Sequence, residues 1–251
     1  MRTDYQRLAA RFDEDRASWS FPRDDVVDEL LGARPVVRVL DLGCGTGRWL
    51  ASQRGLIGGP SLQLFGADPS SAMLREAQSK GIANLAQARA EALPLVDAVI
   101  DYVVSSYAFH HFEEKDAALD EIARVLTADG VFRVNNIEPT AAAGWWLYEF
   151  FPEAIAIDAA RFWQPQRMTT ALEARGFTVT TALDTGPERI LASKALVDAE
   201  RRVVSQLALL PDDAYARGLD RLRAAAGEGA TLSTTRSRLC LTARRCGEMS
   251  R

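Results

Sequence analysis

The hydrophobic and polar positions along the chain change their period near residue 34. Before it, apolar residues recur at helical spacing among charged ones and predict helices over 4–17 and 23–32. After it, short apolar runs alternate with amphipathic stretches. The runs predict strands over 35–42, 62–68, 83–89, 98–106 and 130–137, and the stretches predict helices over 46–55, 70–80 and 114–127. This alternation predicts a parallel sheet that helices cover on both faces.

The pattern changes again after residue 137. Residues 138–163 are rich in aromatic side chains and carry little strand signal, and a helix over 165–175 and a strand over 177–183 follow. We predict two helices within 187–229, with a break near Pro211, and a last strand over 237–245. We expect this last strand to pair antiparallel with the sixth, because that pairing needs no crossover helix.

Composition and charge narrow the class of protein. The chain has 47% hydrophobic and 25% charged residues, as ordinary globular proteins do. Its net charge of −4, with Lys and Arg spread along the sequence, disfavours a nucleic-acid partner. No apolar run approaches the roughly 20 residues of a membrane span, and the charged N-terminus is unlike a secretory signal, so we expect a cytoplasmic protein without a membrane partner. Three scattered cysteines and two histidines predict no metal site.

The most informative motif is "VLDLGCGTGRW", in which Gly43, Gly45 and Gly47 directly follow the first predicted strand. Parallel sheets bind ligands beyond the carboxyl ends of their strands, so the glycines lie where a binding site is expected. Their spacing, G-x-G-x-G, is one residue shorter than the dinucleotide fingerprint G-x-G-x-x-G. The turn therefore lets the backbone approach a ligand, although close packing of the turn could also require the glycines.

Two carboxylates lie at the same predicted edge. Asp68 ends the second strand, where a carboxylate can accept hydrogen bonds from both hydroxyls of a ribose. A helix-capping role is less favoured for Asp68, because Ser70 is available to cap the next helix. Asp41 could hold an ammonium group, directly or through water, or could instead bind the amides of the loop.

Five segments occur in order: "VLDLGCGTGRW", "GADPSSAML", "ARAEALPL", "DYVVSSYAFHHFEE" and "EIARVLTADGVFRV". Together they resemble class I S-adenosylmethionine (AdoMet)-dependent methyltransferases, above all the small-molecule branch that includes the ubiquinone and menaquinone C-methyltransferases. The resemblance covers about residues 33–136. It implies an α/β fold: a Rossmann-like, seven-stranded, mostly parallel sheet with an antiparallel last strand, a helical N-terminal cap and helical insertions. It also implies AdoMet as cofactor and S-adenosylhomocysteine (AdoHcy) as product.

On this resemblance the chain divides into four regions. We expect a helical cap (1–32), an AdoMet-binding core (33–136), an aromatic substrate-lid segment with the sixth strand (137–186), and a helical insertion with the last strand (187–251). By position, the implied cofactor-binding residues are Asp41, Gly43, Gly45, Gly47, Asp68, Ala90, Glu91 and Ser105. Arg89 stands where the family usually has an acidic residue, so adenine would depend on backbone, on Glu91 or on a stacked guanidinium.

Methyl transfer from a sulfonium is an in-line displacement, for which alignment of donor and acceptor can contribute on the order of 7–11 kcal/mol. A base is needed if the acceptor must lose a proton. His110 and His111, the only histidines, follow the fourth strand and are candidates for that base. Closing the loop or capping the next helix is the alternative role for them. Tyr107 is a candidate hydrogen-bonding group beside the acceptor.

The aromatic segment is interpreted as the wall or lid of the acceptor pocket, beyond the packing that part of it must provide. The candidate substrate residues are Trp145, Trp146, Tyr148, Phe151, Arg161 and Phe162. Aromatic concavities suit flat apolar ligands, so the segment indicates an aromatic, polyketide-like or otherwise apolar small-molecule acceptor. The helices within 187–229 could serve as a lid or as a homodimer contact.

The sequence disfavours two other classes of protein and leaves a third open. A nicotinamide-dependent dehydrogenase is opposed by the glycine spacing and by the lack of a Tyr-x-x-x-Lys pair. A nucleic-acid methyltransferase is opposed by the acidic composition and by the lack of an Asn-Pro-Pro-Tyr-like segment after the fourth strand. A non-catalytic AdoMet-binding protein, or one that uses this fold to steer another reaction, stays open.

Overall fold

The computed structural model describes residues 5–17 and 19–245. Over these residues seven strands form one sheet, in the order β3-β2-β1-β4-β5-β7-β6. The strands are β1 (Val37–Leu42), β2 (Leu62–Asp68), β3 (Leu85–Gln87), β4 (Ile100–Ser106), β5 (Leu126–Asn136), β6 (Phe177–Leu191) and β7 (Thr231–Arg245). The first five run parallel, and β7 pairs antiparallel with both β5 and β6, which confirms the predicted architecture.

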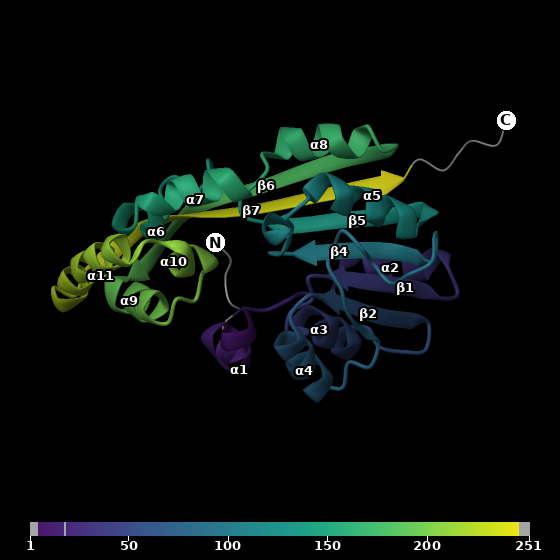
Figure 1. Cartoon of the computed structure of the whole chain (residues 1–251), viewed down its shortest axis with the longest axis horizontal. Helices are drawn as coiled ribbons and strands as arrows, with labels where there is room; N and C mark the ends of the chain where they lie inside the picture. Colours follow the sequence, from purple (N-terminus) through teal and green to yellow (C-terminus); the bar gives the residue numbers. More distant parts are fainter. Residues whose placement is uncertain (1–4, 18, 246–251) are drawn as a thin grey trace.

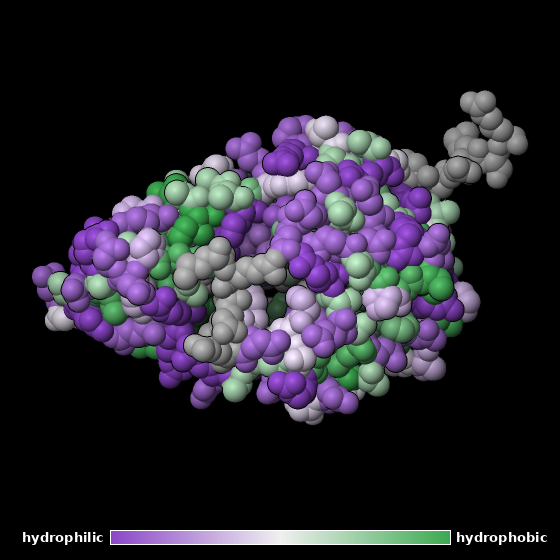
Figure 2. Space-filling model, in the orientation of Figure 1, coloured by the Kyte–Doolittle hydropathy of each residue, from purple (hydrophilic) through white to green (hydrophobic). Residues whose placement is uncertain are grey.

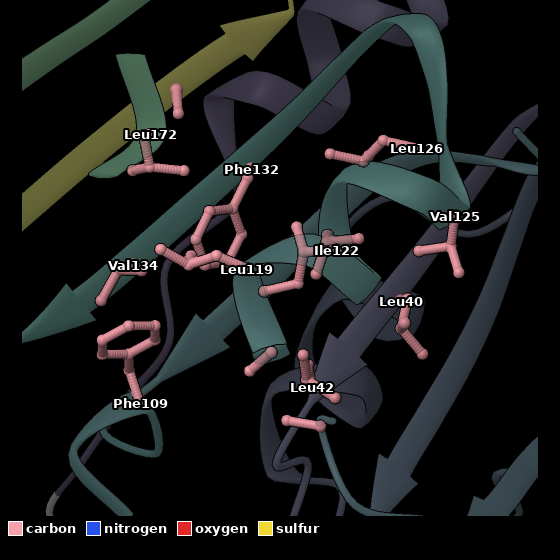
Figure 3. Packing of buried hydrophobic residues seen from close by; sticks show 14 of the residues in the cluster. Leu40, Leu42, Phe109, Leu119, Ile122, Val125, Leu126, Phe132, Val134 and Leu172 are labelled. Carbon is pink, nitrogen blue, oxygen red and sulfur yellow. The ribbon is translucent and has the colours of Figure 1, made fainter. Parts of the chain in front are cut away.

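Helices cover both faces of the sheet, as the alternating pattern predicts (Figure 1). Those that flank it are α2 (Asp25–Ala33), α3 (Arg48–Leu56), α4 (Ser71–Ser79), α5 (Lys115–Val125) and α8 (Pro165–Glu173). On one face, Leu119 and Ile122 of α5 point toward Phe132 on β5 (Figure 3). On the other face, Leu30 of α2 and Trp49 of α3 are buried in a second apolar cluster. No helix of the described residues is long and apolar enough to cross a membrane.

Strands β6 and β7 are longer than the sequence predicts. Residues 184–191 pair with 231–238 in a two-stranded ribbon that extends beyond the end of β5. The prediction of a helix from residue 187 is therefore wrong, and that helix begins at Ala192. Gly186 and Pro187 concealed the strand in the sequence. Proline is tolerated here because β6 lies at the edge of the sheet.

The ribbon carries a helical subdomain, seen at the left of Figure 1. It consists of α6 (Trp146–Phe150), α7 (Glu153–Arg161), α9 (Ala192–Glu200), α10 (Ser205–Leu209) and α11 (Asp212–Gly227). These helices enclose an apolar core of their own, with Phe151 fully buried inside it. At Gly218 a Cβ would come 2.3 Å from the Phe151 ring, so α11 packs closely against the end of α6. The chain thus folds around two separate cores, one in the sheet and one in this subdomain.

Helix α1 (Tyr5–Asp15) lies between the sheet and the helical subdomain (Figure 1). On the sheet side, the Gln6 side chain accepts a hydrogen bond from the Ala72 N–H at 3.0 Å, in the first turn of α4. On the subdomain side, Arg11 donates to the Arg201 carbonyl at 3.0 Å, and Asp15 pairs with the Arg201 side chain at 3.2 Å. The N-terminal helix is therefore connected to both parts of the molecule.

Candidate functional site

A cavity of about 1510 Å³ opens at the carboxyl edge of the parallel strands. Its wall includes the turn after β1, Asp68 at the end of β2, Tyr107 after β4, Asn136 at the end of β5, and Arg161 at the end of α7. Figure 2 shows a hollow near the middle of this face, between the helical subdomain and the sheet. The cavity therefore lies at the edge where parallel sheets bind ligands.

The three glycines after β1 all have positive φ angles, of 78°, 51° and 71°. A Cβ on Gly43 would come 2.4 Å from the Cβ of Ala108, and a Cβ on Gly47 would come 2.9 Å from that of Ala77. A Cβ on Gly45 would meet nothing within 4 Å, because this residue borders the cavity. Close packing thus requires two of the glycines, whereas the third leaves the backbone open to a ligand.

Asp68 holds the glycine turn in place. Its Oδ2 accepts a hydrogen bond from the Gly45 N–H at 2.9 Å, and its Oδ1 accepts one from the Ser70 N–H at 2.8 Å. Ser70 itself caps α4 by accepting from the Met73 N–H at 3.3 Å, which confirms that the helix has its own cap. A carboxylate has about four acceptor positions, so Asp68 keeps capacity for two further donors.

Asp41 lies beside Asp68 and is almost completely buried, with 3% of its surface exposed. Within the described part of the chain, no hydrogen bond reaches its carboxyl group. Burial, and then the negative charge of Asp68, raise the pKa of Asp41 to about 8. At neutral pH this carboxyl group is mostly protonated, and a cation in the cavity would favour its ionised form.

Residues 89–91 form the cavity wall next to β3. The Glu91 side chain accepts hydrogen bonds from the backbone N–H groups of Glu113 at 2.9 Å and Glu114 at 3.1 Å. Arg89 forms ion pairs with Glu91, at 3.4 Å, and with Glu113. The Glu91 carboxylate therefore fastens this loop to the start of α5, and Ala90 lies on the wall between the two charged residues.

The two serines at the end of β4, of which Ser105 is the predicted cofactor-binding residue, differ in their position relative to the cavity. Successive residues of a strand face opposite sides, and Ser106 borders the cavity whereas Ser105 does not. The Ser105 hydroxyl is fully buried and finds no hydrogen-bond partner among the described residues. The residue after Ser106, Tyr107, has a φ of 55°, and its ring lies 5.7 Å from that of Trp19 at a tilt of 53°. A non-glycine residue with positive φ is strained, and such strain is often found at functional sites.

The two histidines lie in a short 3-10 helix, Phe109–His111, on the cavity wall. The Nε2 atom of His111 is 2.7 Å from the Tyr5 hydroxyl of α1, and the two imidazole rings are 4.0 Å apart. His110 stacks on Phe162 at 4.2 Å, and its Nδ1 atom is buried without a hydrogen-bond partner among the described residues. The histidine pair thus links the end of β4 to α1 and to the helical subdomain.

Both histidines are held in the neutral form. Burial, with a further contribution from the positive charges of Arg161 and Lys115, lowers the pKa of His111 to about 3. Burial, the neighbouring His111 and the same two cations lower the pKa of His110 well below its usual value. Neutral imidazoles can accept or donate hydrogen bonds, but taking up a proton at this place is unfavourable.

The aromatic segment divides between the cavity and the core of the helical subdomain. Trp145, Phe162 and Arg161 border the cavity. The other three candidate substrate residues are buried in the subdomain core and do not border the cavity: Trp146, Tyr148 and Phe151. The prediction that they form the acceptor wall is corrected accordingly, because the short helix α6 uses its apolar side chains to build that core.

The network that positions Arg161 was not predicted from the sequence. Asp158, one turn earlier in α7 and fully buried, accepts from Arg161 at 2.8 Å, from the Tyr148 hydroxyl at 2.7 Å and from the Gln206 amide at 2.8 Å. Arg161 also donates to the Ser205 hydroxyl at 3.2 Å. These partners come from three different helices, so only the fold brings them together.

Comparisons with known proteins agree with this geometry. Residues 40–134 match the family described as "Methyltransferase domain". The ubiquinone/menaquinone biosynthesis C-methyltransferase UbiE of Pasteurella multocida is 39% identical over 106 residues, which is 39% of this chain and 39% of that protein. The aligned part of this chain thus spans about two fifths of the length of this curated relative. The family match over residues 40–134 includes the glycine turn, Asp68, Glu91 and the histidine pair.

Solved structures show the same fold over most of the chain. A structure described as a putative methyltransferase from an antibiotic biosynthesis pathway of Anabaena variabilis has a TM-score of 0.64 and 21% identity, and covers 88% of this chain and 97% of that one. The [4+2]-cyclase SpnF has a TM-score of 0.55 and 19% identity, and covers 96% of this chain and 93% of that one. Residues 40–134 thus match a methyltransferase domain, and most of the chain shares the fold of these solved structures.

Proposed function

We propose that the protein transfers a methyl group from AdoMet to a small-molecule acceptor bound in the cavity. The observation that carries this proposal is the convergence of the open Gly45 backbone, Asp41 and Asp68 at one end of a cavity that continues to the histidine pair. A volume of about 1510 Å³ exceeds the roughly 300–1,000 Å³ of common ligand pockets. It has room for a cofactor and an acceptor side by side.

The residues of the cofactor end fit AdoMet. The two remaining acceptor positions of the Asp68 carboxylate suit a pair of ribose hydroxyls. Asp41, whose carboxyl group lacks a partner among the described residues, suits the ammonium group of the methionine moiety. The Gly45 backbone provides close approach, and Ala90 and Glu91 lie where adenine is expected. When bound, AdoMet supplies an electrophilic methyl group on a sulfonium.

The residues of the acceptor end orient the acceptor and exclude water. We assign the neutral imidazoles of His110 and His111, with the hydroxyl of Tyr107, to hydrogen bonding with the acceptor. Their low proton affinity supports an orienting role more than that of a strong general base. Tyr5 of α1 is a positioning residue, because its hydroxyl bonds to His111 where α1 connects the sheet to the helical subdomain.

A second candidate function is AdoMet binding without methyl transfer, in a protein that steers another reaction. The similarity in fold to the cyclase SpnF favours keeping it. One experiment distinguishes the two functions. The protein is incubated with methyl-labelled AdoMet and a panel of small acceptors. Label transferred to an acceptor, and lost in Asp68→Asn, supports the methyltransferase. Tight AdoMet binding with no label transferred to any acceptor supports the second candidate.

A further inference from the structure

The carboxylates along the cavity wall all come from one part of the chain, whereas the cationic side chains come from all along it. Among the described residues, every Asp or Glu on the wall comes from the part of the chain before α5: Asp24, Asp25, Asp41, Asp68, Glu91 and Glu113. From β5 onward, the charged wall residues are all arginines: Arg133, Arg161, Arg236 and Arg238. The part of the described wall that β5 and the later elements form therefore carries cationic side chains and no carboxylate.

Two of these arginines are already neutralised by carboxylates beside them. Arg133 pairs with Asp25 at 2.5 Å and lies 3.6 Å from Asp24. Arg236 pairs with Glu188 at 2.9 Å and with Asp184 at 3.3 Å, both on β6. Neither of these two arginines therefore has an unpaired charge with which to bind a ligand.

Arg161 is held rigidly and still has free donors. Its guanidinium donates one hydrogen bond to Asp158 and one to Ser205, and its Nε atom is buried with no acceptor among the described residues. A guanidinium has five N–H donors, and a buried donor without an acceptor costs about 1–3 kcal/mol. Arg161 also lies 5.7 Å from the ring of Phe162, which stacks on His110, so its charge is next to the histidine pair.

Arg238 differs from the other three arginines, because Arg161 is itself paired with Asp158 at 2.8 Å. It lies on β7 next to Leu239, which pairs with the last residue of β5, so it stands at the edge of the sheet where the cavity opens. Its side chain forms no ion pair within the described residues. Its charge acts on the Tyr107 hydroxyl, which places it near the proposed acceptor position.

We propose that the acceptor carries an anionic group, a carboxylate or a phosphate, and that Arg161 and Arg238 bind it. This inference rests on the proposed methyl transfer and names the substrate class of the same cavity. It changes the expectation of an aromatic or apolar acceptor, because three of the aromatic residues assigned to such a pocket, Trp146, Tyr148 and Phe151, are buried elsewhere. Arginine suits the role, because its planar fork matches the oxygens of carboxylate and phosphate.

Calorimetric titration of the AdoHcy-saturated protein tests the proposal. The probes are inorganic phosphate, benzoate and benzamide, of which benzamide is the neutral counterpart of benzoate. We expect phosphate or benzoate to bind at least tenfold more tightly than benzamide, and the two anions separate a phosphate site from a carboxylate site. Equal affinity for benzoate and benzamide without phosphate binding, or no binding of either anion at millimolar concentration, would overturn the proposal.

Matched variants locate the site. Arg238→Gln removes an exposed arginine without breaking an ion pair, and Arg161→Lys keeps a cation beside the buried Asp158. We expect each to weaken anion binding by tenfold or more. The control Arg223→Gln removes an arginine of α11 whose partners are Glu200 and Asp220, and should leave anion binding unchanged. Unchanged anion affinity in both Arg238→Gln and Arg161→Lys contradicts the inference.

The AdoHcy titration that precedes these measurements keeps the two proposals apart. If the wild-type protein does not bind AdoHcy, the proposed function itself fails. If AdoHcy binds and both Arg238→Gln and Arg161→Lys bind the anions as tightly as the wild type does, only the anionic acceptor is refuted. Methyl transfer to a neutral acceptor alone would also refute it.

Discussion

The sheet and the helical subdomain have cores of similar kind but opposite relations to the cavity. The sheet core is built mostly of aliphatic residues such as Leu119 and Ile122, and the glycine turn and Asp68 stand at strand ends at its edge. The subdomain core is also mostly alanine and leucine, but it takes in several residues of the aromatic segment, such as Phe151, and it faces the cavity through Trp145, Arg161 and a few polar groups. Part of the aromatic segment therefore stabilises the helical subdomain, whereas turns and carboxylates line the cavity at the sheet.

This difference shows which sequence signals report on function. A glycine with positive φ beside a carboxylate that bonds to its N–H is a constraint on chemistry and geometry at once, as at Gly45 and Asp68. A run of aromatic residues can line a ligand pocket or fill an apolar core, and in this chain part of the run fills the core of a small helical unit. If the two regions are independent in this way, a substitution in one of them should leave the properties of the other unchanged.

The largest effect is expected from Phe151→Ala in the subdomain core. Truncating a fully buried phenylalanine costs about 3–5 kcal/mol of unfolding free energy. If the subdomain core is separate, this variant should unfold in two steps during denaturant titration, with AdoHcy binding lost only in the second. Phe132→Ala, in the sheet core, should instead lower the denaturant concentration at which AdoHcy binding is lost. Loss of binding in the first step of Phe151→Ala would show that the two cores unfold as one.

Asp68→Asn should have the next largest effect, confined to the cofactor end. The amide replaces an acceptor that holds the Gly45 and Ser70 N–H groups and has capacity for a ribose. We expect the Kd for AdoHcy to rise about 100-fold, equivalent to about 2.7 kcal/mol. Asp220→Asn, an exposed change on α11, is the control and should leave the Kd unchanged in the same calorimetric assay. A Kd within threefold of wild type in Asp68→Asn would remove Asp68 from the cofactor site.

Gly45→Ala separates ligand contact from backbone strain. The residue has positive φ and open space before it, and so does Gly59, which lies outside the cavity. Both substitutions should cost about 1–2 kcal/mol of stability, because an L-residue is strained in this conformation. Only Gly45→Ala should also weaken AdoHcy binding, by tenfold or more. Equal AdoHcy affinity in the two variants would mean that Gly45 serves the turn alone.

Sequence alone was sufficient for most of the sheet and for the place of the cavity, for physical reasons that particular residues show. Period and turn residues predicted most strands, and Gly43 and Asp68, which border the cavity, were singled out because few residue types suit their positions. Their role in cofactor binding stays a prediction. The ribbon was missed because Pro187 at an edge strand has the same signature as a loop. Ser105 was predicted as a cofactor-binding residue although Ser106 borders the cavity, because a shift of one residue reverses the facing of a strand.

The network around Arg161 could not be predicted in any form. Asp158, Gln206 and Tyr148 come from three helices, and their distances depend on how the subdomain packs on the ribbon. The neutral state of His111 likewise could not be predicted from the sequence, because burial and cations distant in the sequence lower its pKa. Local signals identify strand ends, whereas contacts between elements come only from the fold.

A smaller effect concerns the pH dependence of cofactor binding. The pKa of Asp41 is raised to about 8, so in the free protein its carboxyl group is protonated below that pH. Holding the ammonium group requires the ionised form, and binding should release a proton at pH 7. The affinity for AdoHcy should then increase by up to about tenfold per pH unit toward pH 8 and level off above it. Calorimetry in buffers of different ionisation enthalpy measures the proton, and Asp41→Asn should abolish both effects. A flat pH profile in the wild type would exclude Asp41 from the cation site.

The smallest effect is expected where α1 connects the two regions. Tyr5→Phe removes the hydroxyl that lies 2.7 Å from Nε2 of His111, whereas Asp13 of α1 still pairs with Lys80 at 2.6 Å. One such hydrogen bond contributes about 1 kcal/mol, so we expect AdoHcy to dissociate about fivefold faster in a stopped-flow assay. Tyr215→Phe loses a comparable bond to the Ala199 carbonyl, at 3.0 Å, inside the helical subdomain. It should lower stability by a similar amount without changing dissociation. Equal dissociation rates in the two variants would show that α1 does not close over the cofactor through the histidine pair.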